Sequence, residues 1–340
     1  MSSLSEFDII KRYFSFAETS QGSSHADTLV GIGDDAAVIA AHKNPLVVAT
    51  DTLIEGVHFP PEFLAKHVAS RVMGVNLSDF AAMGATPRWM TMALSLPHID
   101  TDWLAAFSQR LAEICQQYNV TLIGGDTTRI DHGLVISLTV MGETKTSSGL
   151  CLRRNGAQVG DDVWVSGSLG KGAGALQLLM PSKNSMPWIC NKKSKAELLS
   201  SFYMPEPRLA LGNGLVGVAT AAIDISDGLM ADANHIAMQS QVKIIIDGDA
   251  LPIHSGLETN LNRQIVQQWV LSGGDEYELL FTAPTEQSST IESLSLALAL
   301  PCTKIGTVTE SLKEYKSKKD GVSVFGAGWD SQSLKGYTHF

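Results

Sequence analysis

The sequence has few of the features that mark secreted, membrane-spanning or zinc-binding proteins. Its 340 residues include only four cysteines, which lie far apart and form no C-x-x-C pair, so neither a disulfide framework nor a zinc site is expected. No apolar run approaches membrane-spanning length, and the N-terminal stretch MSSLSEFDIIKRYF has charges where a signal peptide would have its apolar core. These absences predict a cytoplasmic protein that does not enter the membrane.

Positive charge is also scarce. The chain has 25 Lys and Arg against 35 Asp and Glu, which gives a net charge of −10. Nucleic acids and anionic membranes are bound through basic surfaces, so neither is an expected partner. An anionic ligand would have to be bound through cations.

Several common catalytic motifs are missing. The glycine-rich stretch GSLGKGAG (167–174) departs from the Walker pattern twice, because Val165 stands where the first Gly belongs and Gly172 where Ser or Thr belongs. Its turn could still hold an anion through backbone amides, which leaves two interpretations of Lys171: a phosphate contact or a solvated turn lysine. There is no G-x-S-x-G and no H-E-x-x-H motif, so serine hydrolase and zinc protease activities lack support.

The length exceeds the usual limit for one core, and strand-like and helix-like segments alternate in both halves. We therefore expect two domains of the α/β or α+β class. The polar stretch TKTSSGL (144–150) is the best linker, which gives domains at 1–148 and 149–340. Residues 181–195 read as an insertion loop.

Two stretches of the first half combine apolar runs with acidic residues. Residues 46–49 read as a buried strand that ends at Thr50 and Asp51, where α/β proteins place ligands. The stretch VMGVNLSDFAAMGATP (72–87) has helical spacing, and Asp79 is its only charged side chain. Asp79 has three interpretations at this point: the N-cap of a second helix that begins at Phe80, a salt-bridge partner, or a ligand for a cation.

An acidic residue beside Gly, Ser, Thr or Asn recurs in six segments, GIGDDA, ATDTL, NLSDF, IGGDTT, IDISDG and SGGDEYE. If these carboxylates converge, each pair about 4 Å apart would repel by roughly 4 kcal/mol at an effective dielectric constant near 20. Cations would relieve that repulsion. Oxygen ligands alone select a hard cation, chiefly Mg²⁺, whose remaining ligands are commonly phosphate oxygens. The pattern therefore indicates phosphoryl transfer.

These motifs, together with the neighbouring stretches EGVHF, LSGGDEYELLF and WDSQSLKGYTHF, resemble the thiamine-monophosphate kinases in order and over nearly the whole chain. Those enzymes belong to the aminoimidazole ribonucleotide synthetase-like superfamily. The resemblance implies a two-domain fold of that superfamily in a homodimer. The N-terminal domain would bind ATP and Mg²⁺ and form a β-barrel with its dimer partner, and the C-terminal α/β domain would complete the nucleotide and substrate site.

The resemblance also implies the activity, which is ATP-dependent phosphorylation of thiamine monophosphate to thiamine diphosphate with several Mg²⁺ ions. We expect direct in-line transfer, because the phosphate acceptor is mostly dianionic at pH 7 and requires no general base. Asp79, Asp126 and Asp227 are the expected catalytic residues.

The remaining site residues follow from the resemblance by position. The metal ligands would be Asp35, Thr50, Asp51, Asp79, Asp126, Asp224 and Asp227. The nucleotide contacts would be Gly125, Asp126, Arg154 and Ser226. The substrate contacts would be His58, Asp275 and Tyr337, with Tyr337 covering the thiamine rings.

Two positions depart from the family pattern. Ala49 stands where the family often has Ser, and the order Asp275-Glu276 replaces the more usual Glu-Asp, so either residue could contact the substrate. Two other functions stay open at this stage. One is a different kinase or ATP-dependent ligase with the same metal core, and the other is a catalytically silent metal-binding or dimeric scaffold.

Overall fold

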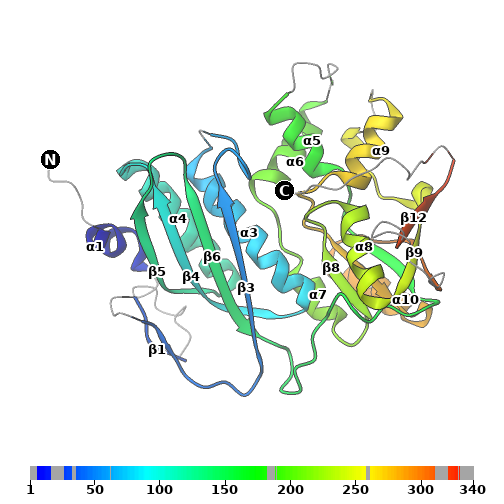
Figure 1. Ribbon diagram of the computed structural model, residues 1–340, viewed down its shortest axis with the longest axis horizontal. Coiled ribbons are helices and arrows are strands. Elements are labelled where there is room, and N and C mark those ends of the chain that lie inside the picture. The colour runs from blue at the N-terminus through cyan, green and yellow to red at the C-terminus, as the bar shows by residue number, and fades with distance from the viewer. Residues whose placement is uncertain are drawn as a thin grey trace. The chain divides into compact units, whose positions relative to one another are not determined.

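The structure is a computed structural model and describes residues 6–16, 27–32, 36–61, 63–181, 188, 190–257, 261–310, 321–327 and 329 (Figure 1). The chain divides into two compact units: unit 1 comprises residues 1–80 and 85–149, and unit 2 comprises residues 81–84 and 150–340. None of the helices in the described ranges is both long enough and apolar enough to span a membrane.

Unit 1 is built on a four-stranded sheet in the order β3-β6-β4-β5, made of β3 (Leu46–Ile54), β4 (Thr86–Leu96), β5 (Thr121–Arg129) and β6 (Val135–Glu143). β6 is antiparallel to both of its neighbours, whereas β4 and β5 run parallel. A separate two-stranded ribbon pairs β1 (Thr28–Val30) with β2 (Val38–Ile39).

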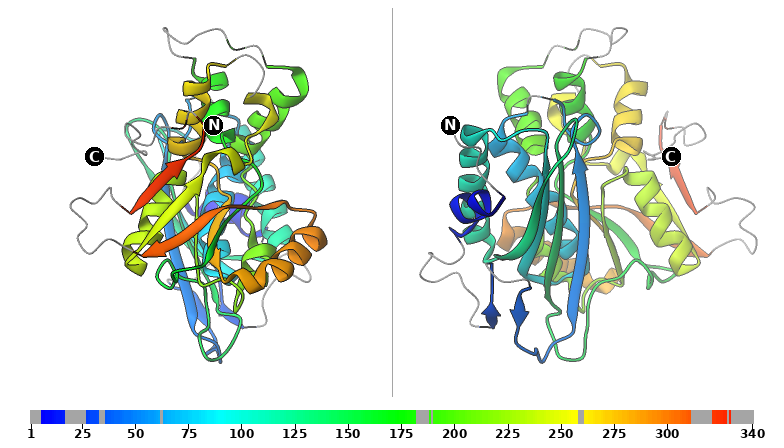
Figure 2. Two further views of the ribbon diagram at one scale, coloured as in Figure 1. Left: turned by 90° about the vertical axis from the view of Figure 1, so that its right-hand side faces the viewer. Right: turned by 60° about the vertical axis from the view of Figure 1, so that its left-hand side comes forward.

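Helices cover one face of this sheet. They are α3 (Ala65–Met83) and α4 (Thr101–Tyr118), seen behind the strands in the right-hand view of Figure 2. Asp100 caps α4, since its Oδ1 accepts hydrogen bonds from the backbone N–H groups of Asp102 and Trp103, both at 3.0 Å. A short helical segment, α1 (Glu6–Ile9) continued by the π-helix η1 (Ile10–Phe14), packs near α4 through an edge-to-face contact of Phe14 with Phe107.

The opposite face of the sheet is exposed, which corrects the interpretation of residues 46–49 as a buried strand. Leu46 is 53% exposed and Val48 is 59% exposed, because β3 is an edge strand with one open face. β3 also continues to Ile54, so Asp51 lies in the middle of the strand rather than at its end. This apolar run is therefore part of an edge strand, and the described part of the chain does not cover its outer side chains.

Unit 2 contains a six-stranded sheet in the order β12-β9-β11-β7-β10-β8. Its strands are β7 (Asp162–Ser166), β8 (Ala221–Asp224), β9 (Val242–Asp247), β10 (Leu279–Ala283), β11 (Cys302–Glu310) and β12 (Val322–Phe325). Only the β12–β9 pair is parallel. The sheet is thus largely antiparallel, in keeping with an α+β unit.

Helices cover both faces of the second sheet. Ile236 of α8 (Leu229–Ser240) and Val270 of α9 (Arg263–Ser272) join one core with Ile223 and Ile244 of the strands. Leu211 of α7 (Leu209–Leu215) and residues of α10 (Ser288–Leu298) join the core on the other face. The remaining helical elements are α5 (Lys171–Leu179), α6 (Lys192–Tyr203) and the short 3₁₀ turns η2 (Gly248–Ala250), η3 (Ser255–Leu257) and η4 (Thr285–Gln287).

Candidate functional site

In unit 1, one buried amide connects two of the elements that carry candidate metal ligands, β3 and α3. The side chain of Asn76 is fully buried; its Nδ2 donates to the carbonyl of Val72 at 2.8 Å, and its Oδ1 accepts from the backbone N–H of Asp51 at 3.1 Å. Asp79 lies three residues further along α3, on the same helix face as Asn76. The amide therefore fixes the strand of Asp51 to the helix of Asp79.

Asp79 is not a helix cap. α3 runs without a break from Ala65 to Met83, so the expectation of a second helix that begins at Phe80 is wrong. The apolar face of one long helix, rather than a helix boundary, explains the spacing around Asp79, which is half-buried. The role of Asp79 as a cation ligand stays a prediction.

Thr50 and Asp51 are consecutive in β3, so their side chains point to opposite faces of the sheet. The hydroxyl of Thr50 lies on the exposed face, 2.9 Å from the hydroxyl of Thr139 in β6. Within one chain, the structure does not bring this hydroxyl and the Asp51 carboxylate to one ion. The metal role of Thr50 stays a prediction.

Asp126 also lies on the exposed face. The strand registers place it in one row with Ala93, Ser137 and Thr52, and its side chain is exposed. Three strand spacings separate β3 from β5, about 14 Å at about 4.8 Å each. Two ligands of one Mg²⁺ ion lie within about 4 Å of each other. One chain alone therefore does not bring Asp126 and Asp51 to the same ion.

His58 lies in the turn that follows β3. Its Nδ1 accepts a hydrogen bond from the backbone N–H of Ile54 at 3.0 Å, and its carbonyl accepts from Nε of Arg71 at 3.0 Å. An imidazole whose Nδ1 is an acceptor carries its proton on Nε2. His58 can therefore donate through Nε2–H, which suits a phosphate oxygen.

In unit 2, the turn between β8 and α8 carries three candidates. β8 ends at Asp224, as expected, and Asp224 is buried. The backbone N–H groups of Ser226 and Asp227 both donate to Oδ2 of Asp232 at 3.1 Å, and Asp232 is itself buried. Asp232 thus fixes the turn that presents Ser226 and Asp227, a role that its place inside a helix did not signal.

The second acidic segment of unit 2 has unusual backbone geometry. Asp275 and Tyr277 have φ values of 62° and 52°, the left-handed region that residues other than Gly rarely adopt. Backbone hydrogen bonds of 2.9 Å hold both residues, from Asp275 N to the Ser226 carbonyl and from Tyr277 N to the Ile225 carbonyl. The Tyr277 hydroxyl donates to Oδ1 of Asp275 at 2.9 Å. This segment therefore holds Asp275 next to Ser226.

Glu276, between them, has a different role. Its carboxylate accepts from the backbone N–H groups of Gly170, Lys171 and Gly172 at 2.9, 3.2 and 3.2 Å. It therefore occupies the N-terminus of α5, the anion site that the glycine-rich turn suggested. Burial raises the pKa of Glu276 to about 8. Glu276 is therefore engaged with the helix, and a substrate contact at Asp275 stays a prediction.

Lys171 is also engaged inside the protein. Its Nζ lies 2.6 Å from Oε1 of Glu278, which is fully buried. Arg208 donates to both oxygens of Glu278 at 2.9 and 2.8 Å, and the Ser166 hydroxyl donates at 2.6 Å. Burial raises the pKa of Glu278, but the charges and hydrogen bonds of Lys171 and Arg208 outweigh it and hold that pKa below its ordinary value. Lys171 is therefore neither of the two things expected from the sequence but part of a buried ion-pair network.

The structure separates two of the expected nucleotide contacts in unit 2. The carbonyl of Arg154 accepts from the hydroxyl of Ser240 at 3.1 Å, at the C-terminal end of α8. Ser226 precedes the other end, about 18 Å away for a helix of 12 residues. In unit 1, a Cβ on Gly125 would collide with the carbonyl of Met92, so this glycine permits close strand approach. These nucleotide roles stay predictions.

The candidate ligands suit a hard cation. All are oxygen donors. In unit 2, burial raises the pKa of Asp232 to about 8, and the negative charges of Asp224 and Asp227 contribute to that increase. That excess of negative charge is what a divalent cation would offset. No three His, Cys, Asp or Glu side chains in the described part of the chain form a complete metal site. Asp35 and Tyr337 lie outside the described residues.

Comparison with known proteins gives matches over the whole chain. Residues 33–144 match the family described as AIR synthase related protein, N-terminal domain. The chain is 38% identical to the thiamine-monophosphate kinase of Haemophilus influenzae, over 96% of this chain and 98% of that protein. It is 34% identical to the thiamine-monophosphate kinase of Bacillus subtilis, over 99% and 100% of the two chains.

Solved structures agree. The thiamine-monophosphate kinase from Stenotrophomonas maltophilia K279a is 41% identical with a TM-score of 0.81, over 95% of this chain and 97% of that one. AaThiL complexed with AMPPCP and TMP is 30% identical with a TM-score of 0.72, over 100% and 99%. The hydrogenase maturation protein HypE, in complex with ATP, shares the fold at 19% identity and a TM-score of 0.69 over 92% and 88%. The expected superfamily fold is confirmed.

Proposed function

The chain belongs to the thiamine-monophosphate kinase family, and from that premise we propose that it phosphorylates thiamine monophosphate to thiamine diphosphate with ATP. The structural observation that best supports the proposal is the hydrogen bond that connects Asp51 to α3 through Asn76. Asp79 lies one turn further along the same helix. A related structure contains AMPPCP, an analogue of ATP, together with TMP. The hydrogen bond through Asn76 joins the strand of Asp51 to the helix of Asp79, which supports a role for both carboxylates as oxygen ligands.

The residues present fit Mg²⁺, which would be held by Asp51 and Asp79 in unit 1 and by Asp224 and Asp227 in unit 2. When bound, the ions would neutralise charge on the transferring phosphoryl group and align it. Asp232 keeps the turn of Asp227 in place, and His58 donates through Nε2–H to the phosphate of the acceptor. No side chain needs to take a proton, because a phosphate monoester is mostly dianionic at pH 7. We therefore propose direct in-line transfer.

We also propose a homodimer that pairs the exposed sheet faces of unit 1. Leu46, Val48 and Ile54 are exposed on that face, at 53%, 59% and 37%. Asp126 shares the face and lies about 14 Å from β3 in its own chain. A second copy seated there would cover these side chains, and Asp126 of one chain could then approach Thr50, the candidate ligand on that face, of the other. The unpaired state of all four cysteines supports a cytoplasmic location.

The activity is tested by ADP formation from ATP and Mg²⁺ with and without thiamine monophosphate. We expect ADP release to depend on thiamine monophosphate and to match thiamine diphosphate formation one for one. Stimulation by a different phosphorylated small molecule would favour another superfamily kinase or ligase. A failure to bind nucleotide in the presence of Mg²⁺ would favour the scaffold alternative.

The mechanism and the dimer have tests of their own. A chiral γ-phosphate should be inverted, and retention or a trapped phosphoenzyme would contradict in-line transfer. For the dimer, the variant Val48→Lys should be monomeric, which light scattering measures. The same variant should also lose activity. Active monomers would contradict a shared site.

A further inference from the structure

Two residues in one short segment of unit 2 have a strained backbone. Asp275 has a φ of 62° and Tyr277 a φ of 52°, both in the left-handed region. Aspartate tolerates that conformation, but a bulky aromatic residue such as tyrosine adopts it rarely. Strained positions persist only where the surrounding structure holds them, and they cluster at functional sites. Residues 275–277 are therefore candidates for a functional role.

The main chain around Asp275 is fixed by its contacts. Its N–H donates to the carbonyl of Ser226 at 2.9 Å. A Cβ on Gly274 would collide with that same carbonyl, and a Cβ on Gly172 would collide with the carbonyl of Gly274. Neighbouring segments thus pack closely on this one, and the buried side chain of Glu276 is tied to the first amides of α5. The freedom that remains at Asp275 is rotation of its own side chain.

Tyr277 restricts that rotation. Its phenol hydroxyl donates to Oδ1 of Asp275 at 2.9 Å, and the residue is only 7% exposed. A buried hydroxyl needs a hydrogen-bond partner, so this bond persists as long as the ring stays in place. The ring is anchored because the N–H of Tyr277 donates to the carbonyl of Ile225. The carboxylate of Asp275 is thus held in one orientation, next to the turn that carries Ser226 and Asp227.

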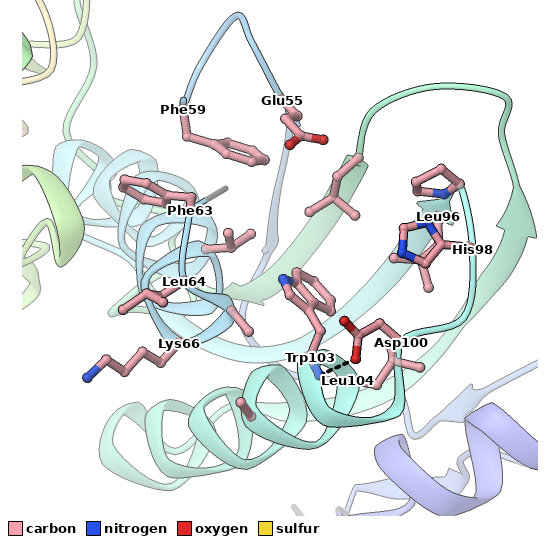
Figure 3. Close-up of a pocket in the computed structure, with 15 residues that line it drawn as sticks. Glu55, Phe59, Phe63, Leu64, Lys66, Leu96, His98, Asp100, Trp103 and Leu104 are labelled. Atoms are coloured by element: carbon pink, nitrogen blue, oxygen red, sulfur yellow. Dashed lines mark hydrogen bonds between the residues drawn. The ribbon is translucent and has the colours of Figure 1, made fainter. Parts of the chain in front are cut away.

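Other carboxyl groups of the protein are held by backbone amides. Asp100, which lines a cavity in unit 1, accepts from the N–H of Trp103 and so caps α4 (Figure 3). Asp232 accepts from two amides of the turn before α8. Such carboxyl groups shape the main chain, whereas the bond from Tyr277 to Asp275 joins two side chains and sets the direction of a carboxylate. A carboxylate can accept several hydrogen bonds, so one phenol does not exhaust its capacity.

We propose that Tyr277 is a positioning residue for the acceptor substrate, because its hydroxyl holds the Asp275 carboxylate in the orientation that contacts thiamine monophosphate. The inference rests on the proposed function and on the predicted substrate contact at Asp275, and it adds the residue that aims this contact. Without the hydroxyl, the carboxylate rotates, and substrate binding must first restrict it. That entropy cost weakens the binding of thiamine monophosphate and leaves the binding of ATP unchanged.

The test uses the full-length enzyme and the variant Tyr277→Phe, which keeps the ring and removes only the hydroxyl. It should raise KM for thiamine monophosphate about three- to tenfold, the loss expected for one hydrogen bond. A contact that serves substrate and transition state equally changes KM alone, so kcat and KM for ATP should stay within about twofold of the wild-type values. Tyr13→Phe is the matched control and should change none of the three, since the hydroxyl of Tyr13 is buried without a hydrogen-bond partner among the described residues.

A second substitution asks whether Tyr277 acts through Asp275. Asp275→Gly removes the carboxylate, and glycine adopts the left-handed backbone of this position without strain. This variant should raise KM for thiamine monophosphate at least as much as Tyr277→Phe does. In the Asp275→Gly background, Tyr277→Phe should add less than about twofold, because the group that it positions is gone. A thermal melt of each variant separates loss of fold from loss of binding, and Tyr277→Phe alone tests the proposal if Asp275→Gly does not fold.

Each outcome decides the proposal. A rise in KM for thiamine monophosphate that requires Asp275 supports it. An unchanged KM in folded Tyr277→Phe or in folded Asp275→Gly, or the same rise in both backgrounds, would overturn it. An equal rise in KM for ATP, or a fall in kcat with KM unchanged, would also overturn it, by assigning Tyr277 a general structural role. Failure of the wild type to phosphorylate thiamine monophosphate would instead contradict the proposed function, so the two failures are distinguishable.

Discussion

The acidic regions of the two units are built in opposite ways. In unit 1, Asp51 and Asp79 lie in the middle of a strand and a helix, and a neutral amide, Asn76, connects these elements. In unit 2, Asp227 and Asp275 lie on irregular backbone: the carboxyl group of Asp232 holds the turn of Asp227, and main-chain carbonyls hold the segment of Asp275.

The difference teaches how each site can be supported. Regular elements fix the direction of a side chain through their own backbone hydrogen bonds, so they need no charged support. Irregular segments leave amides unpaired, and the buried carboxyl groups of Asp232 and Glu276 accept hydrogen bonds from such amides here. Substitutions in the supporting residues of unit 2 should therefore cost stability, whereas those of the unit 1 carboxylates should cost activity alone.

The largest effect is expected for Glu278→Ala. The substitution leaves Lys171 and Arg208 as buried charges without their partner and should lower the free energy of unfolding by about 3–5 kcal/mol. Urea unfolding measures this. Glu113→Ala, which removes an exposed partner of Arg110, is the control and should cost less than about 1 kcal/mol. Equal costs for the two would contradict a buried network.

Asp79→Asn comes next and should affect activity rather than stability. The substitution removes one carboxylate ligand of the metal ions that would neutralise charge on the phosphates. It should therefore lower kcat on the order of 10²–10³-fold. Because α3 is continuous and does not use Asp79 as a cap, its melting temperature should stay close to that of the wild type. An active, folded variant would refute the metal role.

Glu276→Gln should have a smaller effect that depends on pH. The folded pKa of Glu276, about 8, is above the ordinary value of 4.5, so between these values the folded state holds a proton that the unfolded chain has lost. Its contribution to stability therefore falls as the pH rises. At pH 5 the variant should be less stable than the wild type by about 1–3 kcal/mol. That gap should narrow by pH 8, and a gap that stays constant from pH 5 to pH 8 would mean that Glu276 is ionised throughout.

The smallest effect is expected for Thr50→Val. Its hydroxyl pairs with Thr139 on the exposed face, so loss of one exposed hydrogen bond should cost about 1 kcal/mol or less. kcat should change little if the side chain does not contact a metal. A loss of kcat as large as that of Asp79→Asn would show that the hydroxyl is a ligand. Metal ligands would then lie on both faces of the unit 1 sheet, and not only on the face that the helices cover.

The sequence predicted the family because the acidic motifs occur in the order that is typical of it. The family in turn implied the fold class. It did not predict which side of the sheet each residue faces. Thr50 and Asp51 are neighbours in the chain but point apart, and Asp126 lies three strands from β3 on the open face. Strand order and register decide such placements, and neither is visible in local spacing.

The supporting residues of unit 2 were missed for a related reason. Glu276 accepts from backbone amides more than a hundred residues away in the sequence. Asp232 accepts from amides of the turn that precedes its own helix. The sequence offered either Asp275 or Glu276 as a substrate contact, and only the cap on α5 separates them. Lys171 likewise suggested a phosphate site because its partner, Glu278, is more than a hundred residues away.

The central claim is that Asp51 and Asp79 act together as metal ligands in one phosphoryl transfer. A double-mutant cycle with Asp51→Asn and Asp79→Asn, measured as kcat for thiamine diphosphate formation at saturating Mg²⁺, tests it most directly. Residues that act as one unit are strongly non-additive, so we predict that the double variant is about as slow as the slower single variant. If the two losses multiply in full, or if either single variant keeps wild-type activity, the claim is contradicted.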